Sequence, residues 1–321
     1  MFPARPADLP RLSGPYLGQK PPGMTPELFA PDLFSEALHS SVVFSPDGTE
    51  AYFVPWSTLK MKTMRQMNGT WTGPRIVPFA LEHDAENPWL TPDGTRMYFT
   101  STRPIDTDGV APGGKFWREN IWHVDRTGDE WSEPVPLDSS VNVLDLHWQF
   151  SLNAANGDLY FSASSGQLGG GSDIYEAELV NGRHTNPIKL GLPINTAGDE
   201  DTPFVAADGS YLLFARKPGA DTFADLYIAF RDPDGSWRDA TQLGGPVNSS
   251  AHEVCPSVTR DGKHLFFISM RSGQPRIHWV SSGVIDEMRP RADAPGSQAS
   301  EGPEREAPEG NGETARFSAV H

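Results

Sequence analysis

A hairpin phrase that recurs five times constrains the fold of this chain more than any other feature. Each copy has an apolar strand, a polar turn that ends in Asp-Gly or Asn-Gly, and a second strand with aromatic residues. Asp-Gly or Asn-Gly between alternating apolar runs favours a hairpin because these residue types tolerate positive φ. The five copies are VVFSPDGTEAYF (42–53), PWLTPDGTRMYF (88–99), FSLNAANGDLYF (150–161), PFVAADGSYLLF (203–214) and PSVTRDGKHLFF (256–267).

Two further strand-like segments follow each hairpin except the last, which is followed by one. Third strands are predicted at 59–67, where the segment is basic and Met-rich, and at 120–124, 173–179, 225–230 and 276–280. Fourth strands are predicted at 69–79, 129–137, 181–190 and 234–243. Four short antiparallel strands in roughly 50 residues are the pattern of a propeller blade. The sequence therefore predicts an all-β fold, a single five-bladed β-propeller of four-stranded antiparallel blades.

The N-terminal segment supplies the fourth strand that the last unit lacks. Residues 24–35 (MTPELFAPDLFS) match the fourth strands in register, because the interval from Phe29 to His39 equals that from Leu190 to Glu200. We expect this strand to close the ring and leave no open sheet edge. The predicted propeller spans 17–290, after a flexible N-terminus (1–16) and before a disordered tail rich in Pro, Gly and Glu (291–321).

The repeat resembles that of a known family. The phrases SPDGTEAYF, TPDGTRMYFTSTR and RDGKHLFFISMRSG, with the linking phrases LGLPINTAGDEDTP and LGGPVNSSAHEVCP, are similar to the PD40 (WD40-like, TolB-type) β-propeller repeat. The resemblance covers about residues 17–290 and implies the propeller fold. It implies no activity, because propellers carry many unrelated functions. TolB itself has six blades and an N-terminal domain, neither of which this sequence predicts.

Composition narrows the classes of partner. The chain has 321 residues, and its 26 Lys and Arg against 42 Asp and Glu give a formal net charge of −16. Such a chain repels phosphate backbones, so we expect no nucleic-acid partner. Cys255 is the single cysteine, and no apolar run is long enough for a membrane span. We expect a monomer that is cytoplasmic as written, or periplasmic or secreted if the true start lies upstream.

The loops that precede each first strand of a propeller gather at one mouth of its channel, so residues at matching positions form a candidate ring. The ring contains His39, His147, Glu200 and Glu253, and Glu86 joins it after a one-residue shift. Imidazole and carboxylate groups could hold one divalent metal, Ca, Zn, Mn or Fe. Glu86 is a candidate general acid or base, as are the neighbouring residues Asp201 and His252.

Arginines after the second strands, and one long loop, are candidate ligand-binding elements at the same mouth. Arg103, Arg216 and Arg271 follow equivalent strands, and the loop at 103–120 carries Trp117, which could stack on a ligand. The structural alternative is that each arginine pairs with a ring carboxylate and ties neighbouring blades together.

Two functional hypotheses follow. In the first, the chain is a ligand-binding propeller that recognises a carbohydrate, a peptide or a small metabolite at the channel mouth. In the alternative, it is a metal-assisted hydrolase or lyase that uses the His/Glu ring on a glycan or small metabolite. The sequence contains no Gly-x-Ser-x-Gly, HExxH or Cys-x-x-Cys motif, which favours the first hypothesis. A protein partner on the outer blade edges is a third hypothesis.

Overall fold

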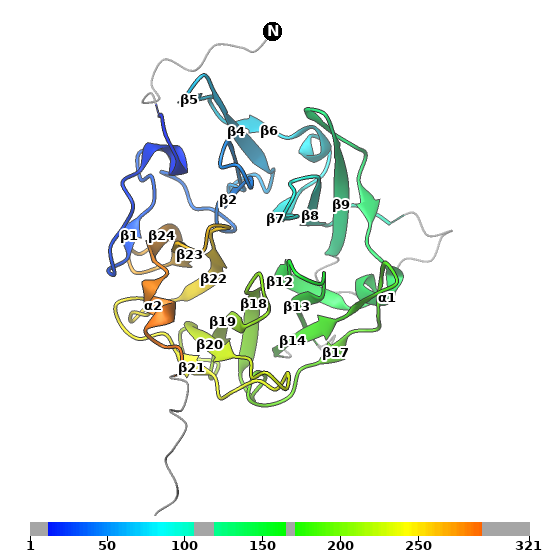
Figure 1. Cartoon of the computed structure of the whole chain (residues 1–321), viewed down its shortest axis with the longest axis vertical. Coiled ribbons are helices and arrows are strands. Elements are labelled where there is room, and N and C mark those ends of the chain that lie inside the picture. Colours follow the sequence, from blue (N-terminus) through cyan, green and yellow to red (C-terminus); the bar gives the residue numbers. More distant parts are fainter. Residues whose placement is uncertain (1–11, 106–118, 165–170, 291–321) are drawn as a thin grey trace, which may run out of the picture. The chain divides into compact units, whose positions relative to one another are not determined.

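Five antiparallel sheets stand around a central channel in the computed structural model (Figure 1). The structure describes residues 12–105, 119–164 and 171–290. The sheets belong to the first of two compact units, Met1–Arg289. The second unit, Pro290–His321, contains the predicted tail, and beyond Pro290 it lies outside the described residues. The prediction of a five-bladed propeller is confirmed.

Each blade follows the predicted strand order from the channel outwards. Blade I contains β2 (Val43–Phe44), β3 (Glu50–Phe53), β4 (Lys62–Met67), β5 (Thr70–Trp71) and β6 (Arg75–Ile76). Blade II contains β7 (Glu86–Leu90), β8 (Arg96–Ser101), β9 (Asn120–Thr127), β10 (Glu130–Trp131) and β11 (Val135–Pro136). Blade III contains β12 (Asp145–Leu152), β13 (Leu159–Ser164), β14 (Ser172–Ala177) and β17 (Ile188–Lys189).

The remaining two blades keep the same order. Blade IV contains β18 (Asp199–Val205), β19 (Tyr211–Lys217), β20 (Asp225–Phe230) and β21 (Thr241–Gln242). Blade V contains β22 (Glu253–Val258), β23 (His264–Ser269), β24 (Arg276–Ser281) and β1 (Glu27–Leu28). The short elements between or beside the blades are η1 (Tyr16–Gly18), η2 (Pro78–Ala80), α1 (Ser139–Asn142), α2 (Gly283–Asp286) and the hairpin of β15 (Leu179–Val180) and β16 (Arg183–His184).

Asp and Gly have separate roles in the hairpin turns. The glycine of each turn has a positive φ, for example 70° at Gly94, whereas the preceding Asp or Asn does not. The Asp93 carboxylate instead accepts hydrogen bonds from the Thr91 hydroxyl (2.6 Å) and the Thr95 amide (3.0 Å). These bonds hold the pKa of Asp93 down at about 2. The turn thus needs glycine for its backbone and Asp for its side chain.

The outer strands are shorter than the sequence predicted. In all five blades the fourth strand has only two-residue pairings, and in four of them a proline interrupts or directly precedes the pairings: Pro26, Pro74, Pro134 and Pro187. Proline has no N–H to donate to the neighbouring strand, so the ladder breaks there.

The N-terminal strand closes the ring as predicted. β1 pairs antiparallel with β24, with Glu27 opposite Trp279 and Leu28 opposite His278. Phe29 is 1% exposed and packs edge-on against Phe266 and Trp279, at ring-centroid distances of 4.9 and 5.0 Å. In Figure 1 the start of the propeller therefore lies beside its end.

The propeller begins before residue 17, where the sequence analysis placed its boundary. The Trp71 amide donates to the Leu12 carbonyl (2.9 Å), and the Trp71 indole donates to the Gly14 carbonyl (2.8 Å). The Tyr16 hydroxyl donates to Asp261 of blade V (2.9 Å). Residues 12–16 therefore contact both blades at the closure, whereas residues 1–11 lie outside the described part of the chain.

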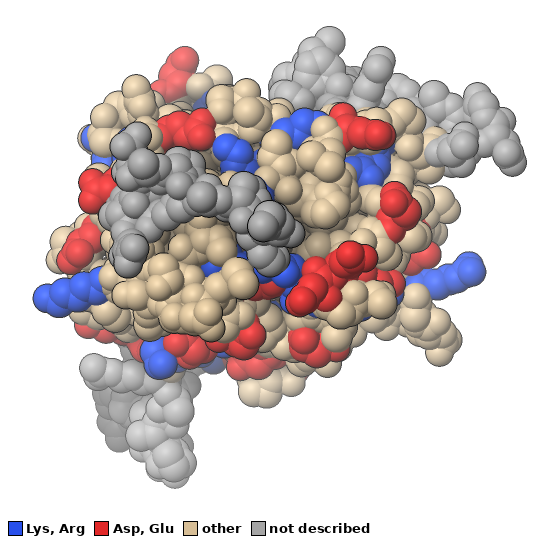
Figure 2. All heavy atoms as spheres, turned by 90° about the horizontal axis from the view of Figure 1, so that it is seen from above, with Lys and Arg blue, Asp and Glu red and all other residues tan. Residues whose placement is uncertain are grey.

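Acidic and basic side chains are interspersed on the face seen in Figure 2. In the described ranges, no helix is long and apolar enough to cross a membrane.

Candidate functional site

The ring carboxylates Glu200 and Glu253 are buried in hydrogen-bond networks at the start of their blades. Both residues are 0% exposed. Glu200 accepts from the Thr196 hydroxyl (2.6 Å) and amide (3.0 Å) and pairs with Arg216 (2.9 Å). Glu253 accepts equivalent bonds from the Ser249 hydroxyl (2.6 Å) and amide (2.9 Å). Both carboxylates therefore order the loop that enters their own blade.

Each of the three predicted ligand-binding arginines donates hydrogen bonds to the loop that enters its own blade. Arg216 donates to the Pro193 carbonyl (2.9 Å) and the Ile194 carbonyl (2.7 Å), and Arg103 donates to the Phe79 carbonyl (2.6 Å). Arg271 lies 3.4 Å from Glu253 and donates to the carbonyls of the loop before it. The acid–arginine pairs of the structural alternative are thus present for Glu200 and Glu253. They lie within one blade rather than between blades, because the two partners sit on adjacent strands.

Glu86 lies one position further along its inner strand than Glu200 does. Glu86 is opposite Thr100, which follows Phe99, and Asp201 is opposite Ala215, which follows Phe214. Glu86 is thus equivalent to Asp201, and the one-residue shift in the sequence is a real structural offset. This offset directs the Glu86 carboxylate toward the channel mouth, where it lines a cavity, rather than toward the loop that enters its blade.

His39 and Glu86 are a pair of predicted site residues that meet at this cavity. His39 Nδ1 lies 3.0 Å from Glu86 Oε2, and the Trp148 indole N–H donates to His39 Nε2 (3.0 Å). An indole nitrogen can only donate, so His39 Nε2 must accept and the ring proton belongs on Nδ1, facing the carboxylate. Trp148 therefore holds His39 as the neutral tautomer beside Glu86.

A bulge in the inner strand places Trp148 in this position. Trp148 has a φ of 67°, which is uncommon for a bulky residue. The equivalent residues Asn87, Thr202 and Cys255 also have positive φ, and the strand register shifts at each of them. The bulge is therefore a feature of the repeat, and the residue type at this position decides what each blade presents.

The His39–Glu86 pair lines a cavity of about 770 Å³ at the channel mouth beside blades I and II. Trp56 is 49% exposed, and its ring lies 4.9 Å from that of His39. Trp148 forms part of another wall. The other lining residues are Thr58, Leu59, Lys60, Glu82, His83, Asp84, Thr102 and Glu119. The cavity thus combines two indoles with several carboxylates and few cationic groups.

Glu119 differs electrostatically from Glu86. Its Oε2 atom is out of contact with solvent, although the residue as a whole keeps part of its surface exposed. Burial, followed by the negative charge of Glu86, raises the pKa of Glu119 well above its ordinary value of 4.5. A carboxyl whose pKa is raised by burial and by a nearby carboxylate is a typical general acid.

The other predicted residues whose side chains the structure describes do not line this cavity. His252 accepts a hydrogen bond from the Ala224 amide (3.0 Å) through Nδ1, and burial lowers its pKa. Asp201 lies on β18 of blade IV. Trp117 lies outside the described residues, and so does the side chain of His147. Within the described part of the chain, no three His, Cys, Asp or Glu side chains group to hold a metal ion.

Sequence reasoning predicted His39 and Glu86 but missed the other lining residues, among them Trp56, Asp84, Glu119 and Trp148. Glu119 ends the long loop of blade II, and Trp148 directly follows His147, so both adjoin segments that the sequence singled out. The signal that could have found Trp148 is its place in the repeat, because it occupies the bulge position of β12. The sequence carries no comparable signal for Trp56.

Comparisons with known proteins show the fold alone. No family model matches the sequence, and no curated protein matches it. Solved structures do: TolB from Agrobacterium tumefaciens is 15% identical, with 77% of each chain covered and a TM-score of 0.52. TolB from Acinetobacter baumannii is 15% identical over 76% of this chain and 54% of that chain, with a TM-score of 0.46. Endo-arabinase from Bacteroides thetaiotaomicron VPI-5482 is 14% identical over 82% of this chain and 97% of that chain, with a TM-score of 0.49.

A propeller fold carries no particular activity with it. The chain has a TolB-like propeller fold, in agreement with the resemblance of its repeat. Function must be argued from the site.

Proposed function

We propose that the chain is a binding protein for a neutral carbohydrate, held in the cavity beside His39 and Glu86. The observation that carries the proposal is the pairing of two indoles with carboxylates in one cavity. Apolar C–H faces of a sugar ring pack on the flat surface of an indole, and sugar hydroxyls donate hydrogen bonds to carboxylates. The volume lies in the range typical of small-molecule sites.

Charge favours a neutral ligand over an anionic one. Among the described residues, the cavity is lined by four acidic residues, Glu82, Asp84, Glu86 and Glu119, and by one lysine, Lys60. An acidic wall repels anions but accepts hydroxyl donors. A peptide or a small cationic metabolite would also suit the negative charge of the cavity. A sugar, however, has both a flat apolar face that packs on the indoles and many hydroxyl groups that donate to the carboxylates.

Calorimetric titration with maltotriose, cellotriose and xylotriose tests the proposal. We expect at least one of these sugars to bind, and Trp56→Ala to weaken its binding by about tenfold or more, since an exposed indole supplies the stacking surface. Trp237→Ala, which removes an indole outside this cavity, is the matched control and should leave affinity unchanged. Absence of binding by all three sugars, or equal loss in both variants, would contradict the proposal.

A hydrolase of the same carbohydrate is a second candidate, favoured by the raised pKa of Glu119 beside Glu86. In that reaction the protonated Glu119 carboxyl would donate its proton to the leaving oxygen as the glycosidic bond breaks, and Glu86 would take a proton from the water whose oxygen forms the new bond to the anomeric carbon. The same titrations distinguish the two functions, because new reducing ends form only if the bound sugar is cleaved. The metal-assisted alternative needs a ligand set that includes His147, and metal analysis of the purified protein tests it.

A further inference from the structure

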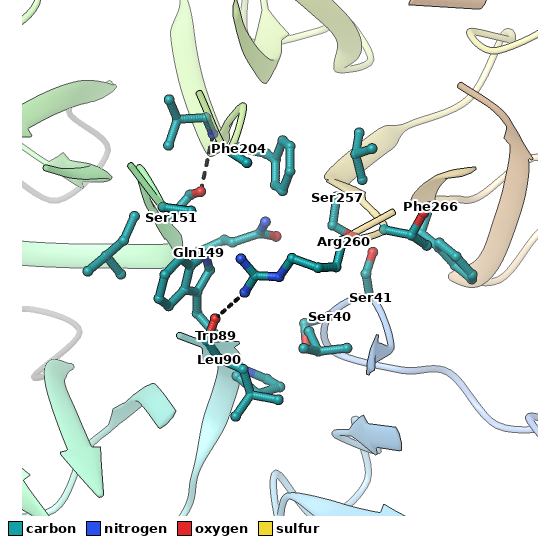
Figure 3. A pocket seen from close by; sticks show the side chains of 18 of the residues that line it. Ser40, Ser41, Trp89, Leu90, Gln149, Ser151, Phe204, Ser257, Arg260 and Phe266 are labelled. Atoms are coloured by element: carbon teal, nitrogen blue, oxygen red, sulfur yellow. Dashed lines mark hydrogen bonds between the residues drawn. The ribbon is translucent and has the colours of Figure 1, made fainter. Parts of the chain in front are cut away.

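The central channel contains a second cavity, of about 190 Å³, that is separate in its lining from the cavity beside His39. All five blades contribute to it through their inner strands and turns, and Figure 3 shows its side chains. One representative from each blade, in order from I to V, is Ser40, Trp89, Gln149, Phe204 and Arg260. The cavity is mostly apolar, so its few polar groups determine what it can bind.

Three polar atoms of this lining have no hydrogen-bond partner among the described residues: Ser40 Oγ, Asn87 Oδ1 and Gln149 Oε1. The residues are 4%, 3% and 9% exposed. Asn87 Nδ2 donates to the Trp148 carbonyl (3.1 Å), and Gln149 Nε2 donates to the Pro256 carbonyl (3.1 Å). Because a carbonyl can only accept, both amides are fixed in orientation, and their oxygens are the atoms without a donor.

Arg260 brings a cation to the same cavity. Its Nη2 reaches from blade V to the Leu90 carbonyl of blade II (2.7 Å), and its guanidinium lies 5.9 Å from the centre of the Trp89 ring. Figure 3 shows the side chain extending into the middle of the pocket. Within the described ranges no carboxylate forms an ion pair with it, and desolvation lowers its pKa. Arg260 is nevertheless exposed, so a solute can reach it.

We propose that this channel cavity binds a small hydroxycarboxylate, with its carboxylate on Arg260 and its hydroxyls donating to Asn87 Oδ1 and Gln149 Oε1. Buried acceptors that lack donors cost free energy, and ligand hydroxyls supply the missing donors. A guanidinium is the side chain best suited to a carboxylate. A simple carboxylate matches only the guanidinium, and an uncharged polyol matches only the two acceptor oxygens.

Size and charge limit the ligand further. A liquid water occupies about 30 Å³, so the cavity has room for about six waters, or for a molecule of a few heavy atoms such as glycerate. The net charge of −16 opposes anions at long range. At physiological ionic strength that repulsion is screened beyond about 8 Å, so the guanidinium dominates inside the channel.

Calorimetric titration of the full chain with D- and L-glycerate, propionate and glycerol tests this assignment. We expect glycerate to bind, and propionate (no hydroxyl) and glycerol (no charge) to bind at least about tenfold more weakly. Arg260→Gln should weaken glycerate binding by about tenfold or more, and Arg260→Lys should keep part of it. Arg183→Gln removes an exposed arginine elsewhere and is the matched control.

The outcomes separate clearly. No glycerate binding, equal binding to Arg260→Gln, or a crystal grown in glycerate that shows only ordered waters in the channel would overturn the assignment. Thermal melting of each variant shows that it is folded. Trp56→Ala should leave glycerate affinity unchanged, so failure of the carbohydrate proposal and failure of this one are independent results.

Discussion

At the scale of single residues, buried carboxylates in this protein occur in two contrasting environments. Glu200 and Glu253 have no exposed surface, yet hydroxyl, amide and guanidinium donors surround them. Glu119 lies near the Glu86 carboxylate and accepts a backbone hydrogen bond from Trp148, and burial, followed by the charge of Glu86, raises its pKa. The first environment ties a loop through hydrogen bonds, whereas the second favours the protonated form of the Glu119 carboxyl.

The pH dependence of the melting temperature of Glu119→Gln tests whether the environment of Glu119 raises the pKa of its carboxyl. A carboxyl whose pKa is higher in the folded than in the unfolded state binds its proton more tightly when folded. Its stabilising contribution is complete below the unfolded pKa, near 4.5, and is lost as the pH rises through the higher folded pKa. The glutamine has no charge to bury, so the melting temperature of the variant should gain on that of the native chain as the pH rises from 5 to 8.

Thermal melts across this pH range provide the measurement. The exposed Glu130→Gln serves as the control, since it removes the same formal charge from the surface. A melting-temperature difference for Glu119→Gln that stays constant with pH would show that the carboxyl is already ionised in the folded protein.

At the scale of elements, β1 determines whether blade V is complete. Only two residues of β1 pair with β24, so the attachment of β1 to blade V depends on the side chain that follows the strand. Phe29 supplies that side chain, packed against Phe34, Phe266 and Trp279. Closure of the ring is therefore driven by apolar burial more than by strand hydrogen bonds.

Phe29→Ala should lower the free energy of unfolding by about 3–5 kcal/mol, the usual cost of removing a buried phenylalanine. Leu28 is 39% exposed in the same strand, so Leu28→Ala is a matched control that should change stability by less than about 1 kcal/mol. Urea unfolding followed by circular dichroism measures both. Similar losses in the two variants would show that the strand itself, and not the phenylalanine, holds the closure.

At the scale of the whole molecule, hydrogen bonds across the channel join blades that are not neighbours in the ring. Trp148 links blade III to His39 of blade I, and Gln149 links blade III to Pro256 of blade V. Arg260 links blade V to Leu90 of blade II. In an open repeat array each unit contacts only its neighbours and can unfold separately. Here ring closure and the cross-channel bonds couple all five blades.

The full chain should therefore unfold in one cooperative transition. Its nine tryptophans are distributed among the blades, so tryptophan fluorescence reports on many units at once, and far-ultraviolet circular dichroism reports on the strands. The two urea profiles should coincide within error. Two separated transitions would indicate that groups of blades fold independently.

The sequence by itself determined the blade count, the hairpins and the closing strand, because these depend on local signals repeated five times. Asp-Gly turns and period-two strands act within about a dozen residues, so a single chain displays them directly. Prolines in the outer segments were equally visible, yet their effect depended on which backbone N–H the neighbouring strand required.

Only the tertiary structure decided which of the matching residues share a site. A one-residue offset in β7 turned Glu86 toward the cavity beside His39, whereas Glu200 and Glu253 turned into loop ties. Trp56, Glu119 and Trp148 converge there from three different chain segments. Side-chain direction at a bulge depends on strand register and on neighbouring blades, and spacing along the chain encodes neither.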